Sequence, residues 1–118
     1  DALRRDGVDV ASAIKRGDVV LVALDATRGS ETRKTRPCVV VSPDELNEHL
    51  RTAIVAPMTT KGRPYPWRIQ CRFQGKTGYV VLDQLRTIDQ ERAASRLGRL
   101  SADTLDQVLE RLQEMFAE

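Results

Sequence analysis

The residues best suited to chemistry are an arginine and two threonines that stand next to strand-like apolar segments. Arg36 comes immediately before the strand expected over residues 37–41, and Thr59 and Thr60 follow the strand expected over residues 52–56. An arginine carries a fixed fork of donors that matches a phosphate, and it stays charged at any physiological pH. A threonine hydroxyl can donate to a second phosphate oxygen. If the two strands are neighbours running in suitable directions, Arg36 and Thr59 lie close together. Such a pair could bind a phosphodiester.

Each of these residues also has a plainer structural interpretation when it is taken alone. Arg36 is then a surface charge at the start of a strand, and Thr59 is a turn residue. The sequence contains no P-loop, no dinucleotide-binding fingerprint and no zinc-protease motif. The only histidine, His49, has no partners for a Ser-His-Asp arrangement. Spacing alone therefore leaves both interpretations open.

The two cysteines do not form a metal-binding pattern. Cys38 and Cys71 lie in separate strand-like segments and lack CxxC spacing, and one histidine cannot complete a zinc site with them. We expect both to be buried, reduced thiols that act as small hydrophobic side chains. The sequence predicts no metal site and no cofactor.

Length and charge narrow the class of protein. The chain has 118 residues, the size of one domain, with no apolar run of the roughly 20 residues that cross a bilayer. No secretory signal is evident, so a cytoplasmic protein without membrane contact is expected. The net charge is only +2, yet residues 28–76 hold ten Lys and Arg against four Asp and Glu. This basic region indicates a polyanion or an acidic partner, or else a well-solvated surface.

The hydrophobic pattern predicts a short extension followed by one mainly β domain. Residues 1–13 contain few large apolar side chains and no clear period, so residues 1–14 are expected to be a flexible extension and the domain covers residues 15–118. A short helix is expected from Pro43 to near Leu50, with Ser42 as its N-cap. Short strands at this spacing predict a small barrel or a strongly bent sheet. The expected strands cover residues 19–24, 37–41, 52–56, 67–73, 78–82 and 85–88.

The end of the chain is expected to be an amphipathic helix. Ser101 is its N-cap, and the apolar side chains recur at the spacing of one helical face. We expect this stripe to pack on the sheet, in preference to a membrane or a partner helix. Its members are Leu105, Val108, Leu109, Leu112, Met115 and Phe116.

The order of several short motifs resembles the MazF/PemK/Kid family of bacterial toxin endoribonucleases, which belong to toxin–antitoxin pairs. The resemblance covers roughly residues 15–117, in order and with family-like spacing, and it leaves out the first 14 residues. The motifs are Arg16-Gly17-Asp18-Val19-Val20, Gly29-Ser30-Glu31, Arg36-Pro37, Pro57-Met58-Thr59-Thr60, the stretch from Gly78 to Asp89, and Gly98-Arg99-Leu100-Ser101.

The resemblance implies a fold and a set of partners. The fold is mainly β with α, a small SH3-like barrel of about five to seven strands shared with the gyrase poison CcdB, with the C-terminal helix packed on it. The resemblance also implies a homodimer, a MazE-like antitoxin as partner, and metal-independent cleavage of single-stranded RNA at short sequences. In this sequence the family's catalytic residues fall on Arg36 and Thr59, its loop glutamate on Glu31 and its glutamine on Gln84.

RNA contacts are expected along the basic loop and beside the two catalytic residues. Many family members carry a Gln-Gly-Gly stretch where this chain has Thr32-Arg33-Lys34-Thr35, which leaves the target sequence open. Two added positive charges should strengthen phosphate contacts more than they sharpen base choice. Tyr65 and Trp67 could stack on bases, although Trp67 could equally be a core residue. The expected RNA-binding residues are Ser30, Glu31, Arg33, Lys34, Thr35, Thr60, Lys61, Gln84 and Arg86.

Metal-free cleavage of RNA can use the neighbouring 2′-hydroxyl as nucleophile, which gives a 2′,3′-cyclic phosphate and a free 5′-hydroxyl. For this reaction we expect Arg36 to clamp the developing anion and Thr59 to donate to it. Arginine is a poor general base because it is effectively never neutral in water, so the base stays open between Glu31 and a water. Two alternatives remain on the same barrel, a gyrase poison and a non-catalytic nucleic-acid-binding regulatory module.

Overall fold

The structure, a computed structural model, describes residues 14–23 and 35–118. The extension predicted for residues 1–14 lies outside this part of the chain except for its last residue. Ile14 is partly buried and packs against the core. None of the described helices is long and apolar enough to cross a membrane.

The order of elements is that of a mainly β chain ending in a helix, as the sequence predicted. The strands are β1 Asp18–Ala23, β2 Thr35–Val40, β3 Thr52–Thr59, β4 Arg68–Phe73, β5 Lys76–Val81, β6 Arg86–Asp89 and β7 Ala93–Arg99. The helices are α1 Asp44–His49 and α2 Ala102–Phe116, and two 3₁₀ turns, η2 Leu82–Gln84 and η3 Gln90–Arg92, flank β6.

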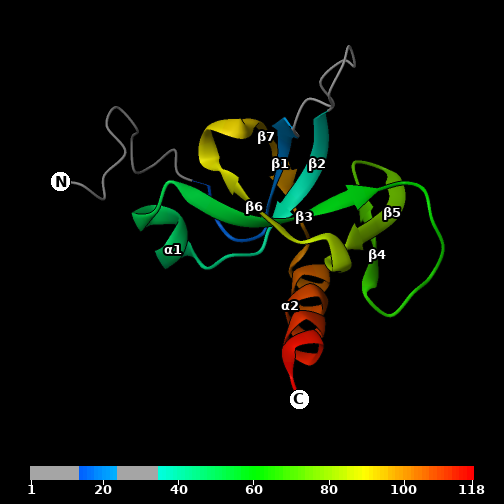
Figure 1. The fold of residues 1–118 in the computed structure, drawn as a ribbon. Helices are drawn as coiled ribbons and strands as arrows, with labels where there is room; N and C mark the ends of the chain where they lie inside the picture. The colour runs from blue at the N-terminus through cyan, green and yellow to red at the C-terminus, as the bar shows by residue number, and fades with distance from the viewer. Residues whose placement is uncertain (1–13, 24–34) are drawn as a thin grey trace, which may run out of the picture.

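The strands of the described residues form one strongly curled, half-barrel sheet with the order β4-β5-β3-β2-β1-β7. β3 crosses the middle of the molecule in Figure 1, and β6 pairs with it outside the main path. Val55 of β3 is opposite Val40 of β2 on one edge and opposite Arg86 of β6 on the other. Further along β3, Met58 and Thr59 pair with β5. The sheet is therefore built around β3.

Alternation along the strands divides the core into two clusters on opposite faces of the sheet. Cys38 and Val40 of β2 lie with Val55 of β3 in one cluster. Val39 of β2 and Met58 of β3 lie in the other, which α2 covers. Both cysteines are buried and free, as predicted.

α2 confirms most of the prediction for the C-terminal helix. Thr104 N–H donates to the Ser101 hydroxyl at 3.2 Å, so Ser101 is the N-cap. Val108 is fully buried, and Leu105, Leu112 and Met115 are partly buried against the same cluster. Phe116 is the exception, because its side chain is 73% exposed. The last turn of α2 extends past the sheet in Figure 1, and of its two large apolar residues only Met115 packs on the cluster.

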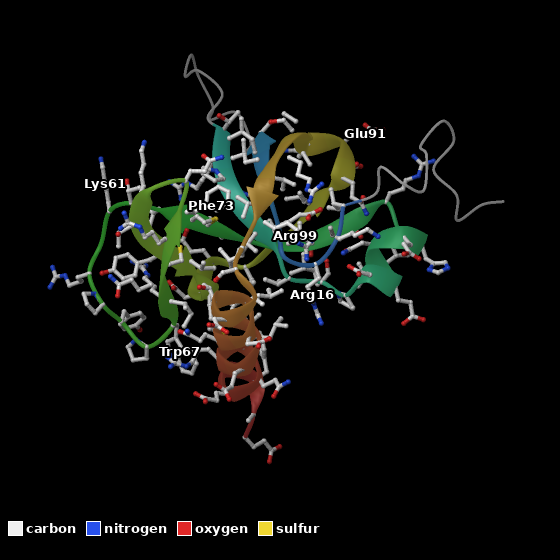
Figure 2. The ribbon with its side chains drawn as sticks, turned by 180° about the vertical axis from the view of Figure 1, so that it is seen from behind. Arg16, Lys61, Trp67, Phe73, Glu91 and Arg99 are labelled. Atoms are coloured by element: carbon white, nitrogen blue, oxygen red, sulfur yellow. The ribbon has the colours of Figure 1, made fainter. Side chains whose placement is uncertain are left out.

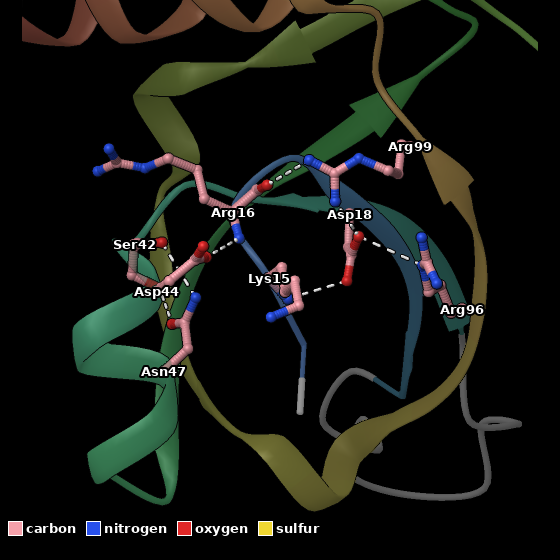
Figure 3. Close-up of polar contacts among 8 residues, drawn as sticks. All are labelled: Lys15, Arg16, Asp18, Ser42, Asp44, Asn47, Arg96 and Arg99. Atoms are coloured by element: carbon pink, nitrogen blue, oxygen red, sulfur yellow. Dashed lines mark hydrogen bonds and ion pairs between the residues drawn. The ribbon is translucent and has the colours of Figure 1, made fainter. Parts of the chain in front are cut away.

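Four local predictions need correction. The N-cap of α1 is Pro43, and it is without a side-chain cap. The Ser42 hydroxyl instead donates to Asn47 Oδ1 at 2.6 Å (Figure 3). It also accepts the Ile54 N–H at 2.9 Å, so it ties α1 to β3. β2 begins at Thr35 and β3 runs on to Thr59, so both candidate catalytic residues lie inside strands. β7 was missed because none of its residues is buried and its sequence shows no alternation of apolar and polar side chains.

A buried carboxylate joins the first and last strands (Figure 3). Asp18 is 2% exposed. Its Oδ1 lies 2.8 Å from Arg99 Nη1 and 3.3 Å from Arg96 Nε, both of β7. Its Oδ2 accepts the Lys15 N–H at 2.9 Å. The carboxylate therefore fixes the start of β1 against β7, where the pairing carries two register shifts.

Replacing Asp18 with Ala should destabilise the fold by about 2 kcal/mol, because a buried acceptor of several hydrogen bonds is lost. Chemical denaturation followed by circular dichroism measures the free energy of unfolding of this variant and of the wild type. Glu110→Ala on the exposed side of α2 is the control, and we expect it to stay within about 0.5 kcal/mol of the wild type. Equal stability of the two variants would contradict this role for Asp18.

Candidate active site

The register of β2 and β3 places Arg36 beside Thr59. Antiparallel pairing sets Cys38 opposite Pro57, and the same register continued by two residues sets Arg36 opposite Thr59. Both residues lie an even number of positions from the buried pair on their strands, so their side chains leave the same face of the sheet. The β2–β3 ladder ends at Pro57, which has no N–H to extend it, and β3 then pairs with β5. Arg36 and Thr59 therefore stand where β2 and β3 separate.

Thr59 is held from two sides. Tyr79 of β5 pairs with it, and a Cβ on the adjacent Gly78 would lie 2.4 Å from the Thr59 carbonyl oxygen. Only a glycine allows β5 to approach β3 this closely. On the other side, Lys61 N–H donates to Thr59 Oγ1 at 3.1 Å. The hydroxyl oxygen thus accepts a bond from the protein, which leaves its own proton available to donate.

Two adjoining hollows meet at Arg36 and Thr59. One is a recess of about 250 Å³, lined by Arg36, Thr59, Lys61, Gly62, Arg68, Val81 and Gln84. The other is a groove of about 360 Å³ on the side of the α2-covered cluster. Its polar lining includes Thr35, Thr60 and Lys76, and its apolar lining includes Met58, Phe73 and Leu97. Figure 2 shows Lys61 beyond the end of β3 and Phe73 on the adjoining hairpin.

Charge in this region is mainly positive. Within residues 14–23 and 35–118, no carboxylate forms an ion pair with Arg36. Arg68 is paired with Asp83 through two contacts of 3.2 and 3.3 Å, and this hydrogen bonding holds the pKa of the Asp83 carboxyl below its usual value. Burial raises the pKa of the Cys38 thiol to about 11, although the positive charges of Arg36 and Arg86 lower it. The thiol is therefore neutral at physiological pH and places no negative charge beside Arg36.

The structure brings together most of the predicted site residues that it describes. Arg36, Thr59, Lys61 and Gln84 share the recess, and Thr35 and Thr60 line the groove beside it. Arg86 lies further back on β6, opposite Val55. The four predicted residues of the basic loop, Ser30, Glu31, Arg33 and Lys34, lie outside the described residues.

Sequence reasoning missed several residues that shape the site. Arg68 lines the recess and is paired with Asp83, and Gly78 sets the approach of β5 to Thr59. Gly78 stands in a quoted motif, but its role depends on a contact 19 residues away in sequence. The structure distinguishes the roles of the two aromatic residues Tyr65 and Trp67, for which stacking on bases was considered. Trp67 packs on the α2-covered cluster and lies near α2 in Figure 2, whereas Tyr65 is 53% exposed.

This arrangement suits the stabilisation of an anion. A fixed positive charge and a hydroxyl donor face one recess, and further donors from Lys61 and Gln84 line it. Among the described residues, no cluster of three or more His, Cys, Asp or Glu side chains could hold a metal ion. The chemistry assigned to this recess rests on its arginine and hydroxyl groups.

Comparison with known proteins identifies the family. A family model described as a PemK-like, MazF-like toxin of type II toxin–antitoxin systems matches residues 15–116. Endoribonuclease PemK of Escherichia coli is 37% identical over 111 residues, which cover 89% of this chain and 84% of that protein. Endoribonuclease EndoA of Bacillus subtilis is 34% identical over 110 residues, 88% of this chain and 95% of that protein.

Solved structures agree in fold. The MazE–MazF crystal structure from Deinococcus radiodurans matches with a TM-score of 0.77 and 27% identity, covering 87% of this chain and 95% of that chain. The crystal structure of MazF alone from the same organism matches with a TM-score of 0.72, and the match covers 87% of this chain and 96% of that chain. The half-barrel with a C-terminal helix is thus the fold that the resemblance implied. With a family model that spans nearly all of its length, the chain belongs to the PemK-like, MazF-like toxins of type II toxin–antitoxin systems.

Proposed function

We propose that this protein is an endoribonuclease that acts as the toxin of a type II toxin–antitoxin pair and cleaves single-stranded RNA without a metal ion. The observation that carries the proposal is the meeting of Arg36 and Thr59 in one recess at the point where β2 and β3 separate. The matched relatives bear the name endoribonuclease, which agrees with the chemistry of this recess.

Cleavage begins with attack of a ribose 2′-oxygen on the neighbouring phosphorus, as the 2′-hydroxyl gives up its proton. The bond from phosphorus to the 5′-oxygen then breaks, the 5′-oxygen takes a proton, and the products end in a 2′,3′-cyclic phosphate and a 5′-hydroxyl. Between these events the phosphorus carries an additional oxygen and more negative charge. Donors placed in advance around that charge lower the barrier most.

Arg36 and Thr59 are suited to this task in different ways. The Arg36 guanidinium contributes a permanent charge and two parallel donors, and it can also supply the proton for the 5′-oxygen. Thr59 Oγ1 accepts a hydrogen bond from Lys61 N–H, which polarises the hydroxyl group. The hydroxyl proton is then available to donate to a phosphate oxygen. The base that takes the 2′-proton is Glu31, in the loop outside the described residues, or a water.

The partners follow from the charge of the site and from the family. Single-stranded RNA places its phosphates along the basic region of residues 28–76, and mRNA is the substrate in the cytoplasm. A MazE-like antitoxin with an acidic or amphipathic segment covers the same basic face and blocks RNA by occlusion. The toxin acts as a homodimer.

The two alternatives considered from the sequence are less well supported. A gyrase poison needs no phosphate clamp made from two strands, and a non-catalytic nucleic-acid-binding module does not account for the names of the matched relatives. The named relatives that match most of this chain are endoribonucleases.

Removing either catalytic group should abolish most of the activity. We expect Arg36→Ala and Thr59→Val each to lower the rate of RNA cleavage by about 100- to 1,000-fold, since each removes one donor to the developing anion. The measurement is single-turnover cleavage of a defined RNA. Thr59→Ser keeps the hydroxyl and should retain activity.

Two controls match these variants. Lys15→Ala and Thr87→Val change exposed residues before β1 and on β6, outside the basic region of residues 28–76, and both should cleave at the wild-type rate. Circular dichroism establishes that all variants are folded. A folded Arg36→Ala protein with wild-type activity would overturn the assignment.

The ends of the products test the route of cleavage. We expect a 2′,3′-cyclic phosphate and a 5′-hydroxyl, because the nucleophile belongs to the RNA, and we expect full activity in excess EDTA. Mass spectrometry of the fragments distinguishes these ends from 5′-phosphates. Fragments with 5′-phosphate ends would rule out attack by the 2′-hydroxyl, and loss of activity in EDTA would rule out the metal-free route.

The close approach of β5 to Thr59 gives a third test. Gly78→Ala should lower cleavage at least about tenfold, since the added Cβ would lie 2.4 Å from the Thr59 carbonyl oxygen and must displace it. Gly75→Ala is the control: its φ of 79° makes it strained by about 1 kcal/mol, yet its Cβ would meet open space. Rates measured well below both melting temperatures should fall for Gly78→Ala only. If both variants cleave equally, Gly78 does not position Thr59.

A further inference from the structure

We propose that Tyr65 is a stacking platform for a nucleobase next to the cleaved phosphate. The inference rests on the proposed function, because it assigns a role to a side chain beside the recess of Arg36 and Thr59. It concerns affinity for RNA rather than the chemical step.

The backbone around Tyr65 is fixed before any ligand binds. Pro64 and Pro66 flank the residue, and each locks its own backbone φ. The Tyr65 carbonyl accepts the Arg68 N–H at 2.9 Å, and the two residues form an isolated antiparallel bridge. The loop between β3 and β4 arcs away from the sheet in Figure 1, but this end of it is tied to the start of β4. A side chain on such a backbone loses little freedom on binding.

Arg68 supports the ring from beneath. Its guanidinium carbon lies 5.8 Å from the centroid of the Tyr65 ring, within the range of a cation–π contact. The guanidinium itself is held by both oxygens of Asp83. Asp83 thus anchors Arg68, and Arg68 in turn positions the aromatic ring.

The same arginine connects the ring to the site. Arg68 lines the recess together with Arg36 and Thr59. A nucleotide whose phosphate is bound by Arg36 and Thr59 therefore has Arg68, and the ring above it, along its path out of the recess.

Exposure beside the recess distinguishes Tyr65 from the other aromatic residues that the structure describes. Its side chain is 53% exposed although one side contacts Arg68. Trp67, two residues later, is packed on the core, and the exposed Phe116 is at the end of α2. An exposed, fixed aromatic beside a phosphate site is the arrangement with which proteins bind unpaired bases. Because every base has a π-face, this contact adds affinity with little choice among bases.

The test measures RNA binding and cleavage separately. The probes are single-stranded RNAs that carry 2-aminopurine on the 5′ or the 3′ side of the mapped cleavage position, with a 2′-O-methyl group there to prevent cleavage. We expect Tyr65→Ala to raise the Kd of these probes by about 5- to 150-fold, the equivalent of about 1–3 kcal/mol for one stacked base. In cleavage assays KM should rise while kcat changes little.

Matched variants separate stacking from other effects. Tyr65→Phe and Tyr65→Trp keep an aromatic ring and should keep the affinity for the probes. Phe116→Ala removes an exposed aromatic side chain at the end of α2 and should leave the Kd unchanged. Binding of the wild type should quench 2-aminopurine fluorescence on one side of the cut, and Tyr65→Ala should abolish that quenching.

The possible results are distinguishable. An unchanged Kd for Tyr65→Ala, or fluorescence that this substitution leaves quenched, overturns the stacking role while wild-type cleavage still supports the proposed function. A wild type that binds the probes but never cleaves unmodified RNA overturns the proposed function instead. Loss of affinity in Tyr65→Phe as well would assign the contact to the hydroxyl and contradict stacking.

Discussion

The register between β2 and β3 is the constraint on which the site depends. Cys38 lies opposite Pro57, and Arg36 and Thr59, each two positions further along its strand, line the same recess. A shift of one residue would send one of them to the α2-covered side, because side chains alternate along a strand. The same pairing buries Cys38, Val40 and Val55 in one cluster, so hydrophobic packing enforces the register that the chemistry needs.

The other elements hold the two strands in this relation. β1 pairs along β2, and the buried Asp18 carboxylate ties the start of β1 to β7. On the far side of β3, the three residues of η2 let the chain pass from pairing with Met58 and Thr59 to pairing with residues 52–55. Gly78 sets the distance there. Arg36 and Thr59 are thus supported by different neighbours and meet only at the separation of their own strands.

Much of this could be predicted from local sequence. Apolar runs revealed six strands, the spacing of apolar residues revealed α2, and ordered motifs pointed to Arg36 and Thr59. β7 escaped because none of its residues is buried and its sequence shows no alternation of apolar and polar side chains, the pattern that marks a strand. Ser42 was misassigned because capping is local, whereas its bonds to Asn47 and Ile54 depend on how α1 docks on β3. The arrangement of Arg68, Asp83 and Tyr65 involves residues up to 18 apart in sequence, beyond the reach of any periodic pattern.

Strand pairing across the whole domain also determines when, during synthesis, the active site is assembled. Arg36 is near the start of the chain, but Thr59 is fixed only after β5 has been made, and β1 is closed only by β7 at residues 93–99. A nascent chain on the ribosome therefore has no assembled site while most of it is still being translated. Activity belongs to the fold in which β5 and β7 are in place, so the site cannot be complete before residues 93–99 have been translated.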